Sequence, residues 1–420
     1  MKISTTLTSA LVASSSILSL VGEPLPFDQS PTTSLIPSIT GTPNFLEKIK
    51  FSGDIRARYE FRETDPLDES NALTVRARIG VTLGDFNGFS AFAEWEGTGA
   101  PGDDFRSNPA GSPSTSPNVI GNSVISDPEN SELNRLYLQY ANDGFLAKVG
   151  RQRIIRNNAA FIGNVGWRQN EQTFDAAQVG YKKDAFSVSY VYSDRVQRIF
   201  GEDAAGALNE FEGDFHLIDF SYKADIGDLG GYAYLIDVEN NANVGESNTY
   251  GVFGTFNGLY AEFAYQDGDS AKAGGDYDAI YAHLKYTKKV SGVTLMGGIE
   301  YLEDEFKTPF ATVHAFNGFA DAFVLQRIGL NNGPGGNYNG LTDFYLGLVK
   351  PGLPGGITLK GFLHYYLDGD FDNTYGYEAD LVLAKKFNDN LSGLIKAAYF
   401  VGEDFYDDIK QVSVQLDYKF

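Results

Sequence analysis

A cluster of arginines is the part of this sequence best suited to bind a ligand, because its members recur at every second position of extended segments. Alternate residues of a strand share one face, so two consecutive segments place four guanidinium groups on adjoining faces, and a later segment adds a fifth. Such groups repel one another unless negative charge lies nearby. They could guide a carboxylate or a uronate polymer by bidentate hydrogen bonds, or they could form salt bridges that stiffen a wall. The cluster consists of Arg56, Arg58, Arg76, Arg78 and Arg135.

A second candidate is the long connection at residues 154–173, together with the segment just before it. This region is rich in arginine, amide and aromatic side chains, and it holds one of only two tryptophans in the chain. Amides and guanidinium groups can line a polar path, and aromatic rings beside amides suit the faces and hydroxyl groups of sugars. We expect the loop to fold inward and form a constriction; the alternative is a loop packed on the rim. Its candidate pore-lining residues are Arg151, Arg153, Trp167, Arg168, Gln169, Asn170 and Glu171.

Catalytic and metal-binding chemistry finds little support in the sequence. The four histidines are not paired at metal-ligand spacing, and no H-E-x-x-H or G-x-S-x-G motif occurs. Residues 368–373 resemble the start of a calcium loop, but Ala379 stands where a bidentate glutamate is required. We therefore predict no catalytic residue, no metal and no cofactor, and a protein that is not an enzyme.

The elements that must position these residues are strands. From Phe51 onward, apolar and polar residues alternate in eighteen successive segments, of which the first covers 50–62 and the last 409–420. In the last segment every second residue from Val412 to Phe420 is apolar, and the residues between them are polar. A lipid-facing strand with an interfacial aromatic anchor has this pattern. The terminal aromatic also resembles the closing strand of bacterial outer-membrane barrels, where it serves as the insertion signal.

The connections between the segments alternate between short and long. Tight turns such as Asn257-Gly258 alternate with long loops such as 97–131 and 303–340. This is the layout of an outer-membrane barrel, whereas a β-propeller, the nearest soluble alternative, would show a blade-length repeat that we do not find. The predicted fold is all-β: a closed antiparallel transmembrane β-barrel of about 18 strands, with short periplasmic turns and long extracellular loops.

Composition and charge agree with that fold. The 25 Tyr, 31 Phe and 47 Gly suit aromatic girdles and turns, and the absence of cysteine excludes disulfides. The net charge of −22 argues against nucleic acid as a partner. Residues 1–22 have the charge and apolar run of a signal peptide, and 23–48 are expected to be a flexible periplasmic lead-in. The predicted barrel covers 49–420.

Two segments resemble the alginate-export family of bacterial outer-membrane barrels. One runs from Gly150 to Ile154 and continues over 161–175, and the other is 314–321 in a long outer loop. The overall resemblance extends over roughly 51–420 and agrees with the eighteen segments.

The resemblance implies an outer-membrane location, a monomer, and a basic conduit for polyanionic chains that includes Arg151, Arg153 and Arg168. This chain departs from the family in its charge, because acidic residues such as Glu94 and Glu262 also fall on the predicted inner face. A purely polyuronate-selective pore is therefore not implied.

The sequence thus predicts an outer-membrane channel for the passive passage of hydrophilic solutes, with anionic saccharides favoured. A general diffusion porin of low selectivity is the alternative, and a surface-binding or enzymatic barrel is a third. The expected partners are outer-membrane lipid and lipopolysaccharide, the barrel-assembly machinery through Phe420, and an anionic or neutral saccharide.

Overall fold

A computed structural model describes residues 45–420 of the chain. The predicted signal peptide at 1–22 lies outside the described residues, as does most of the predicted lead-in at 23–48. The lead-in's last residues form a short 3-10 helix, η2 (Phe45–Lys48), immediately before the first strand. Among residues 45–420, no helix has the length and apolar character needed to cross a membrane.

The described residues form eighteen strands, the number that the alternating segments predicted. The strands are β1 (Ile49–Thr64), β2 (Ser70–Phe86), β3 (Phe89–Asp104), β4 (Asn130–Asn142), β5 (Phe145–Gln152), β6 (Thr173–Lys183), β7 (Phe186–Gln197), β8 (Glu210–Ala224), β9 (Gly227–Val238), β10 (Gly245–Phe256), β11 (Leu259–Ser270), β12 (Gly275–Val290), β13 (Val293–Leu302), β14 (Leu341–Leu353), β15 (Ile357–Leu367), β16 (Thr374–Lys386), β17 (Leu391–Gly402) and β18 (Ile409–Lys419). The short helices are η3 (Gly206–Leu208), α1 (Val324–Arg327), η4 (Pro334–Gly336) and η5 (Pro354–Gly356).

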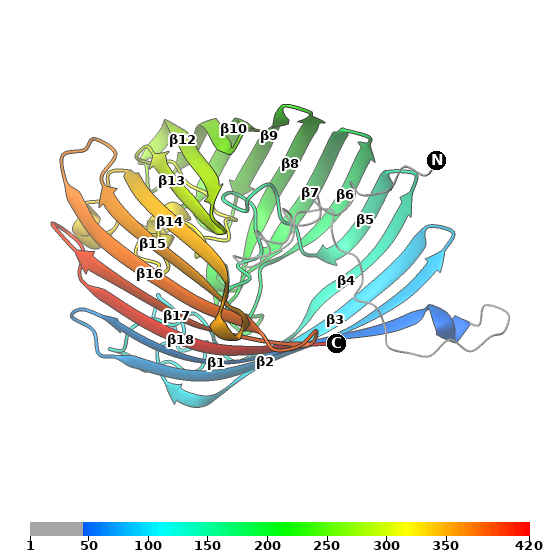
Figure 1. Cartoon of the computed structure of the whole chain (residues 1–420), viewed down its shortest axis with the longest axis horizontal. Helices are drawn as coiled ribbons and strands as arrows, with labels where there is room; N and C mark the ends of the chain where they lie inside the picture. The colour runs from blue at the N-terminus through cyan, green and yellow to red at the C-terminus, as the bar shows by residue number, and fades with distance from the viewer. Residues whose placement is uncertain (1–44) are drawn as a thin grey trace.

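The sheet closes on itself. Each strand pairs antiparallel with its neighbour in sequence, and β1 pairs with β18 from Asp54↔Lys419 to Thr64↔Ile409. The ring of strands is visible in Figure 1, where the first and last strands lie side by side. Closure satisfies every strand edge, which a bilayer requires. The predicted closed antiparallel β-barrel is confirmed.

The two faces of the wall follow the period of two. Outward residues are apolar and exposed, as shown by Leu138 at 63% and Val149 at 56%. The inward residues of β1 and β2 are polar and buried, including Arg58 at 1% and Arg76 at 0%. A charged side chain on the lipid face near the midplane costs about 2–4 kcal/mol, so this polarity fixes which face looks outward.

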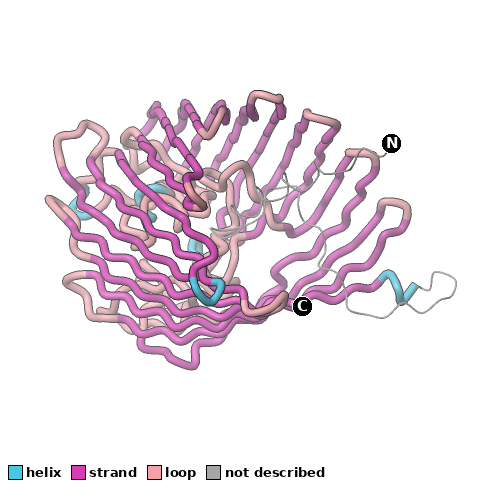
Figure 2. The backbone as a smooth tube through the Cα atoms, in the orientation of Figure 1, coloured by secondary structure: helices cyan, strands magenta, loops and turns pink. Residues whose placement is uncertain are grey.

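Two long loops fold into the barrel instead of extending away from it, and loop segments are seen within the ring of strands in Figure 2. The first inner loop (153–172) joins β5 to β6, and the second inner loop (303–340) joins β13 to β14. Phe310 of the second loop packs its ring 4.9 Å from that of Phe215 on β8. Phe161 of the first loop lies 5.1 Å from the ring of Tyr281 on β12. The interior core is therefore built from loop rings against wall rings.

The closing seam gives a testable prediction. The Phe420 ring lies over Gly53 so closely that a Cβ at that position would collide with it, and the two residues exchange main-chain hydrogen bonds of 2.9 and 3.0 Å. We expect Gly53→Val to lower the stability of the barrel by about 1–3 kcal/mol, because the added methyl groups must displace the terminal ring.

The measurement is the temperature at which the barrel loses its compact mobility on gels without prior boiling. Gly99→Val is the matched control, because a Cβ at Gly99 meets nothing within 4 Å. Equal melting of the two variants would contradict the assigned role of the seam.

Candidate functional site

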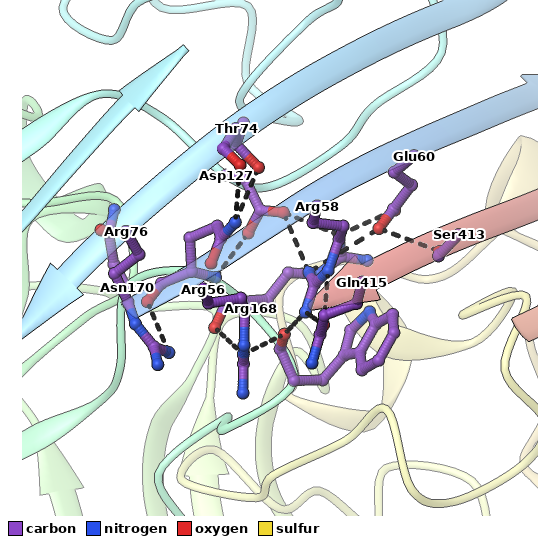
Figure 3. Close-up of polar contacts among 12 residues, drawn as sticks. Arg56, Arg58, Glu60, Thr74, Arg76, Asp127, Arg168, Asn170, Ser413 and Gln415 are labelled. Atoms are coloured by element: carbon purple, nitrogen blue, oxygen red, sulfur yellow. Dashed lines mark hydrogen bonds and ion pairs between the residues drawn. The ribbon is translucent and has the colours of Figure 1, made fainter. Parts of the chain in front are cut away.

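The first inner loop lies directly on the predicted arginine cluster. The Arg56 Nη1 group donates to the main-chain oxygen of Trp167 at 3.1 Å, and Arg58 donates to the same oxygen. Arg78 Nη2 donates to the main-chain oxygen of Gln169 at 3.2 Å. Figure 3 shows Arg56 and Arg58 reaching from their strand toward this loop. The arginines therefore hold the loop against the inner wall of the barrel.

Each arginine of the cluster also forms an ion pair with a carboxylate. A buried guanidinium needs such a partner because its desolvation is costly. The salt-bridged wall that the sequence left open is present, and it also supports the loop. The pairs are Arg56–Asp417 at 2.8 Å, Arg58–Asp127 at 3.2 Å, Arg76–Asp54 at 2.5 Å, Arg78–Glu96, and Arg135–Glu94 at 2.7 Å.

Glu171 is the centre of this network. It is 1% exposed and accepts hydrogen bonds from Arg153 Nε and Nη2 at 2.7 and 2.8 Å. The amides of Asn134 and Asn164 donate to it at 2.7 and 2.8 Å, and Arg78 Nη1 lies 3.6 Å away. Burial opposes ionisation, but Arg153 and Arg78 outweigh it and lower the pKa of Glu171 below its ordinary value. The buried carboxylate of Glu171 thus anchors the loop to the arginines around it.

The two inner loops meet at Arg168 and Trp167. Arg168 Nη1 donates to Glu60 on β1 at 3.0 Å, and its Nη2 donates to Asp321 of the second loop at 2.9 Å. The Trp167 ring stacks on His314 of the second loop, with centroids 4.7 Å apart and planes at 8°. The two segments that suggested a family resemblance are therefore in direct contact, although they are far apart in sequence.

His314 is held as a neutral ring at this junction. Its Nδ1 atom lies 2.8 Å from Asp321 Oδ1, and its Nε2 atom contacts the Lys396 ammonium group. Because the ionised Asp321 carboxylate can only accept a hydrogen bond, Nδ1 carries the ring proton and donates to Asp321. Burial lowers the pKa of His314 to about 3, although Asp321 acts against the shift and Lys396 adds to it.

One predicted pore-lining residue is placed elsewhere. Arg151 lies on the same side of β5 as the exposed Val149, and it pairs with Asp175 at 2.8 Å on the outer face. The expectation that Arg151 belongs to an interior conduit is corrected by this geometry, because two positions on one side of a strand share a face. The other predicted residues all lie in the interior network; Gln169 and Asn170 bind β2 and β3 through Thr74 Oγ1 at 2.8 Å and Thr98 Oγ1 at 2.7 Å.

Sequence reasoning missed several partners of the arginines. Asp127 comes from the β3–β4 loop, where no periodic pattern marks an inward side chain. Asp417, the partner of Arg56, was accessible in principle, because it alternates with exposed apolar residues on its own strand. The odd or even position of such a residue along its strand gives the face on which it lies. Which residue it meets depends on the register between neighbouring strands.

The histidines serve structural contacts. His283 Nε2 and His364 Nδ1 lie 2.7 Å from Tyr345 Oη and 2.9 Å from Asp343 Oδ1. Among residues 45–420, no group of three or more side chains is arranged to hold a metal ion. Asp368 in the calcium-like segment instead accepts from the main chain of its own turn, at Asp372 N, at 2.9 Å.

A closed antiparallel barrel of eighteen strands with an apolar exterior and an ion-paired interior has the architecture of an outer-membrane β-barrel protein. The alginate export family matches residues 47–203, from η2 to the connection after β7. The predicted family resemblance is confirmed, and the matched part contains the first inner loop. The segment 314–321 lies outside it. No curated protein matches the chain.

Several solved outer-membrane structures share the fold. OpdK of Pseudomonas aeruginosa, solved with vanillate, is 12% identical with a TM-score of 0.64, and the match covers 90% of this chain and 100% of that one. OccK8 (OprE) of the same organism is 14% identical with a TM-score of 0.64, covering 90% and 99%. OccAB4 of Acinetobacter baumannii is 14% identical with a TM-score of 0.62, covering 89% and 98%. At these identities the likeness concerns the fold.

Removing the charge of Glu171 should release the first inner loop. Glu171→Gln leaves Arg78 and Arg153 without their shared anion, so we expect a loss of about 3–5 kcal/mol in the stability of the docked loop. The measurement is limited proteolysis within 154–172 in detergent, together with the barrel melting temperature. Glu63→Gln removes an exposed pair with Lys410 and should change stability by less than about 1 kcal/mol. Equal protease resistance in both variants would refute this role of Glu171.

Acidification should loosen the contact between the two loops. The pKa of His314 is lowered from 6.5 to about 3, so the unfolded or undocked ring takes up a proton first. Its contribution to docking is therefore complete above pH 6.5 and is lost as the pH falls toward 3. In a Trp95→Phe background, Trp167 fluorescence should report this change, and His314→Gln should suppress it. A response unchanged by His314→Gln would exclude His314 as its source; His216→Gln, on the outer face, is the control.

Proposed function

We propose that the barrel passes hydrophilic anionic solutes of the saccharide type passively across the outer membrane, through a constriction made by the two inner loops. The observation that carries the proposal is the exposure of the ion pairs. The Arg153 side chain is 17% exposed while its partner Glu171 is fully covered. Arg135 is 12% exposed and its partner Glu94 is 6% exposed. The cation of each pair therefore faces the lumen more than the anion does.

Two lysines on the inner faces of β5 and β12 add positive charge to the barrel interior. Lys148 on β5 lies 4.6 Å from the centroid of Tyr137, and Lys285 on β12 lies 5.2 Å from that of Tyr260. Both alternate with outward-facing apolar residues, so both point into the lumen. A cation held over a ring can still attract a carboxylate from its open side. The vanillate in the OpdK structure is itself a carboxylate bound to a barrel of this shape.

A general diffusion porin of low selectivity is the second candidate. The many ion pairs neutralise much of the arginine charge, and Asp54 reverses the pattern, since it is 22% exposed while its partner Arg76 is fully covered. The net charge of −22 also favours weak selectivity for anions. The two candidates differ in what the exposed guanidinium groups do to ion flow.

The remaining parts of the proposal concern processing and partners. We propose that 1–22 is a signal peptide and that 23–48 is a periplasmic lead-in. The apolar exterior would contact lipid and lipopolysaccharide. The terminal Phe420, 50% exposed on the outer face, would engage the barrel-assembly machinery. A monomer is proposed because one chain closes the barrel.

Ion selectivity tests the proposal. In planar bilayers across a KCl gradient, we expect a reversal potential of the sign for anion preference, and block of the current by added oligouronates. Arg153→Gln should reduce both effects, because it removes the more exposed member of its pair. Arg151→Gln, two residues away on the outer face, should leave both unchanged. Cation preference without uronate block would instead establish the general porin.

A further inference from the structure

A continuous series of rings lines the inner wall on the side opposite the arginine cluster. The series starts near the short β10–β11 turn and ends at the junction of the two inner loops. Its members come from five strands, β10, β11, β12, β14 and β15, and from both inner loops. We call it the ring track. In order, it consists of Phe253, Tyr260, His283, Tyr345, His364, Phe362, Phe319, His314 and Trp167.

The wall part of the ring track is unbroken. The ring centroid of Tyr260 lies 6.4 Å from Phe253 and 5.4 Å from His283. Tyr345 lies 5.9 Å from His283 and 5.8 Å from His364. These separations are those of rings in van der Waals contact. A solute ring leaving one member would therefore meet the next without crossing open water.

The loop part continues the series into the constriction. Phe362 lies 6.3 Å from His364 and 5.8 Å from Phe319 of the second inner loop. His314 is stacked 5.5 Å from Phe319 and 4.7 Å from Trp167 of the first inner loop. The ring track thus ends where the two inner loops meet.

Glycines let two of the rings lie flat on the wall. A Cβ at Gly298, the cross-strand neighbour of Tyr345, would come within 2.5 Å of its ring atoms. A Cβ at Gly347, opposite Phe362, would come within 2.6 Å of that ring. A ring that lies over a glycine has one face against the backbone and turns the other toward the lumen. This arrangement presents a binding face, which an upright ring would not.

Neither core packing nor a lipid girdle accounts for the ring track. The rings that form the interior core, such as Tyr281 and Phe310, are 0% exposed, whereas Tyr345 and Phe362 are only half-buried. The lipid-facing residues of the same strands point to the outside of the barrel, as shown by Leu346 at 65% exposure. Tyr345 and Phe362 therefore border the interior space, while His283 at 5% and His314 at 6% exposure connect the more exposed rings from beneath.

Polar groups sit at the edges of these rings. Tyr345 Oη lies 2.7 Å from His283 Nε2, and Tyr260 Oη donates to Glu262 at 2.5 Å. Each hydroxyl retains lone pairs that can accept from a further donor. Ligand sites generally combine apolar faces with a few placed polar groups. A pyranose ring has the matching form, with an apolar C–H face and hydroxyl groups at its rim.

We infer that the ring track is a binding path for the pyranose rings of a saccharide chain, which stack on successive flat faces as they approach the loop junction. Lys285 beside Tyr260 would tolerate a carboxylate on the sugar without requiring one. The inference rests on the proposed function, because it needs a lumen that admits solute. It adds that neutral saccharides bind as well, which a purely electrostatic conduit would not predict.

The test is current block in planar bilayers by a neutral glucose hexasaccharide, compared with a hexauronate and with vanillate. We expect both hexasaccharides to block the wild-type channel. Tyr345→Ala and Phe362→Ala should each weaken the block roughly two- to tenfold, as loss of one ring contact implies. Tyr365→Ala removes an outward-facing ring from the same strand as Phe362 and is the matched control. Tyr345→Leu and Phe362→Leu keep the bulk, remove the flat face, and should weaken the block in the same way.

Binding can also be followed without current. The chain has two tryptophans, and Trp95 is 43% exposed on the outer face, so Trp95→Phe leaves Trp167 at the end of the ring track as the reporter. Saccharide should change Trp167 fluorescence in the parent and less in the Phe362→Leu variant.

The outcomes separate the two proposals. A conducting channel that neither saccharide blocks would overturn the ring track and leave the channel standing. Block by the hexauronate and vanillate but not by the neutral sugar would also overturn it, in favour of charge alone. A protein that inserts and folds but passes no ions would overturn the proposed function itself.

Discussion

The pairing of β1 with β18 is the constraint on which the rest of the structure depends. A strand edge left open in a bilayer would expose a row of unpaired donors and acceptors, so the sheet is stable there only as a ring. Closure fixes the curvature, and curvature gives each strand one lipid face and one lumen face. From that point the period of two in the sequence decides where every side chain goes. Arg58 and Arg76 converge in the interior because no other face is open to them.

The guanidinium groups that converge in the interior need hydrogen-bond acceptors and negative charge, and the first inner loop supplies both. The loop brings main-chain oxygens and Glu171 to guanidinium groups that would otherwise be buried with too few acceptors. The desolvation of these charges is costly, so the ion pairs serve position more than net stability. The contacts specify one place for the loop on the wall. The second inner loop is then positioned by the first, through Arg168 and the Trp167–His314 stack.

The lumen that results has two unlike walls. One is basic and ion-paired, over β1 to β5, and the other carries the ring track over β10 to β15. The loops lie between them and contact both. An anionic saccharide has two features, charge and flat apolar faces, and each wall matches one of them.

The sequence by itself determined the closed barrel, the number of strands, the short-turn and long-loop ends, and the inward faces of β1 and β2. All of these depend on local alternation and turn chemistry, which a single chain displays directly. It also indicated that the first inner loop folds inward, because ordinary solvating residues are scarce in it. The assignment of Arg151 to the conduit was wrong because it followed a family resemblance. The alternation of residues along β5 places Arg151 on the same outer face as Val149.

Only the tertiary structure decided which charges pair, where the two inner loops meet, and that rings from five strands and two loops form one track. Asp127 reaches Arg58 from a loop with no periodicity, and Trp167 meets His314 across a long stretch of sequence. Tyr345 faces Gly298 because of the register between β13 and β14. These contacts depend on cross-strand register and loop closure, which are set by the whole ring of hydrogen bonds and are not written in any one segment.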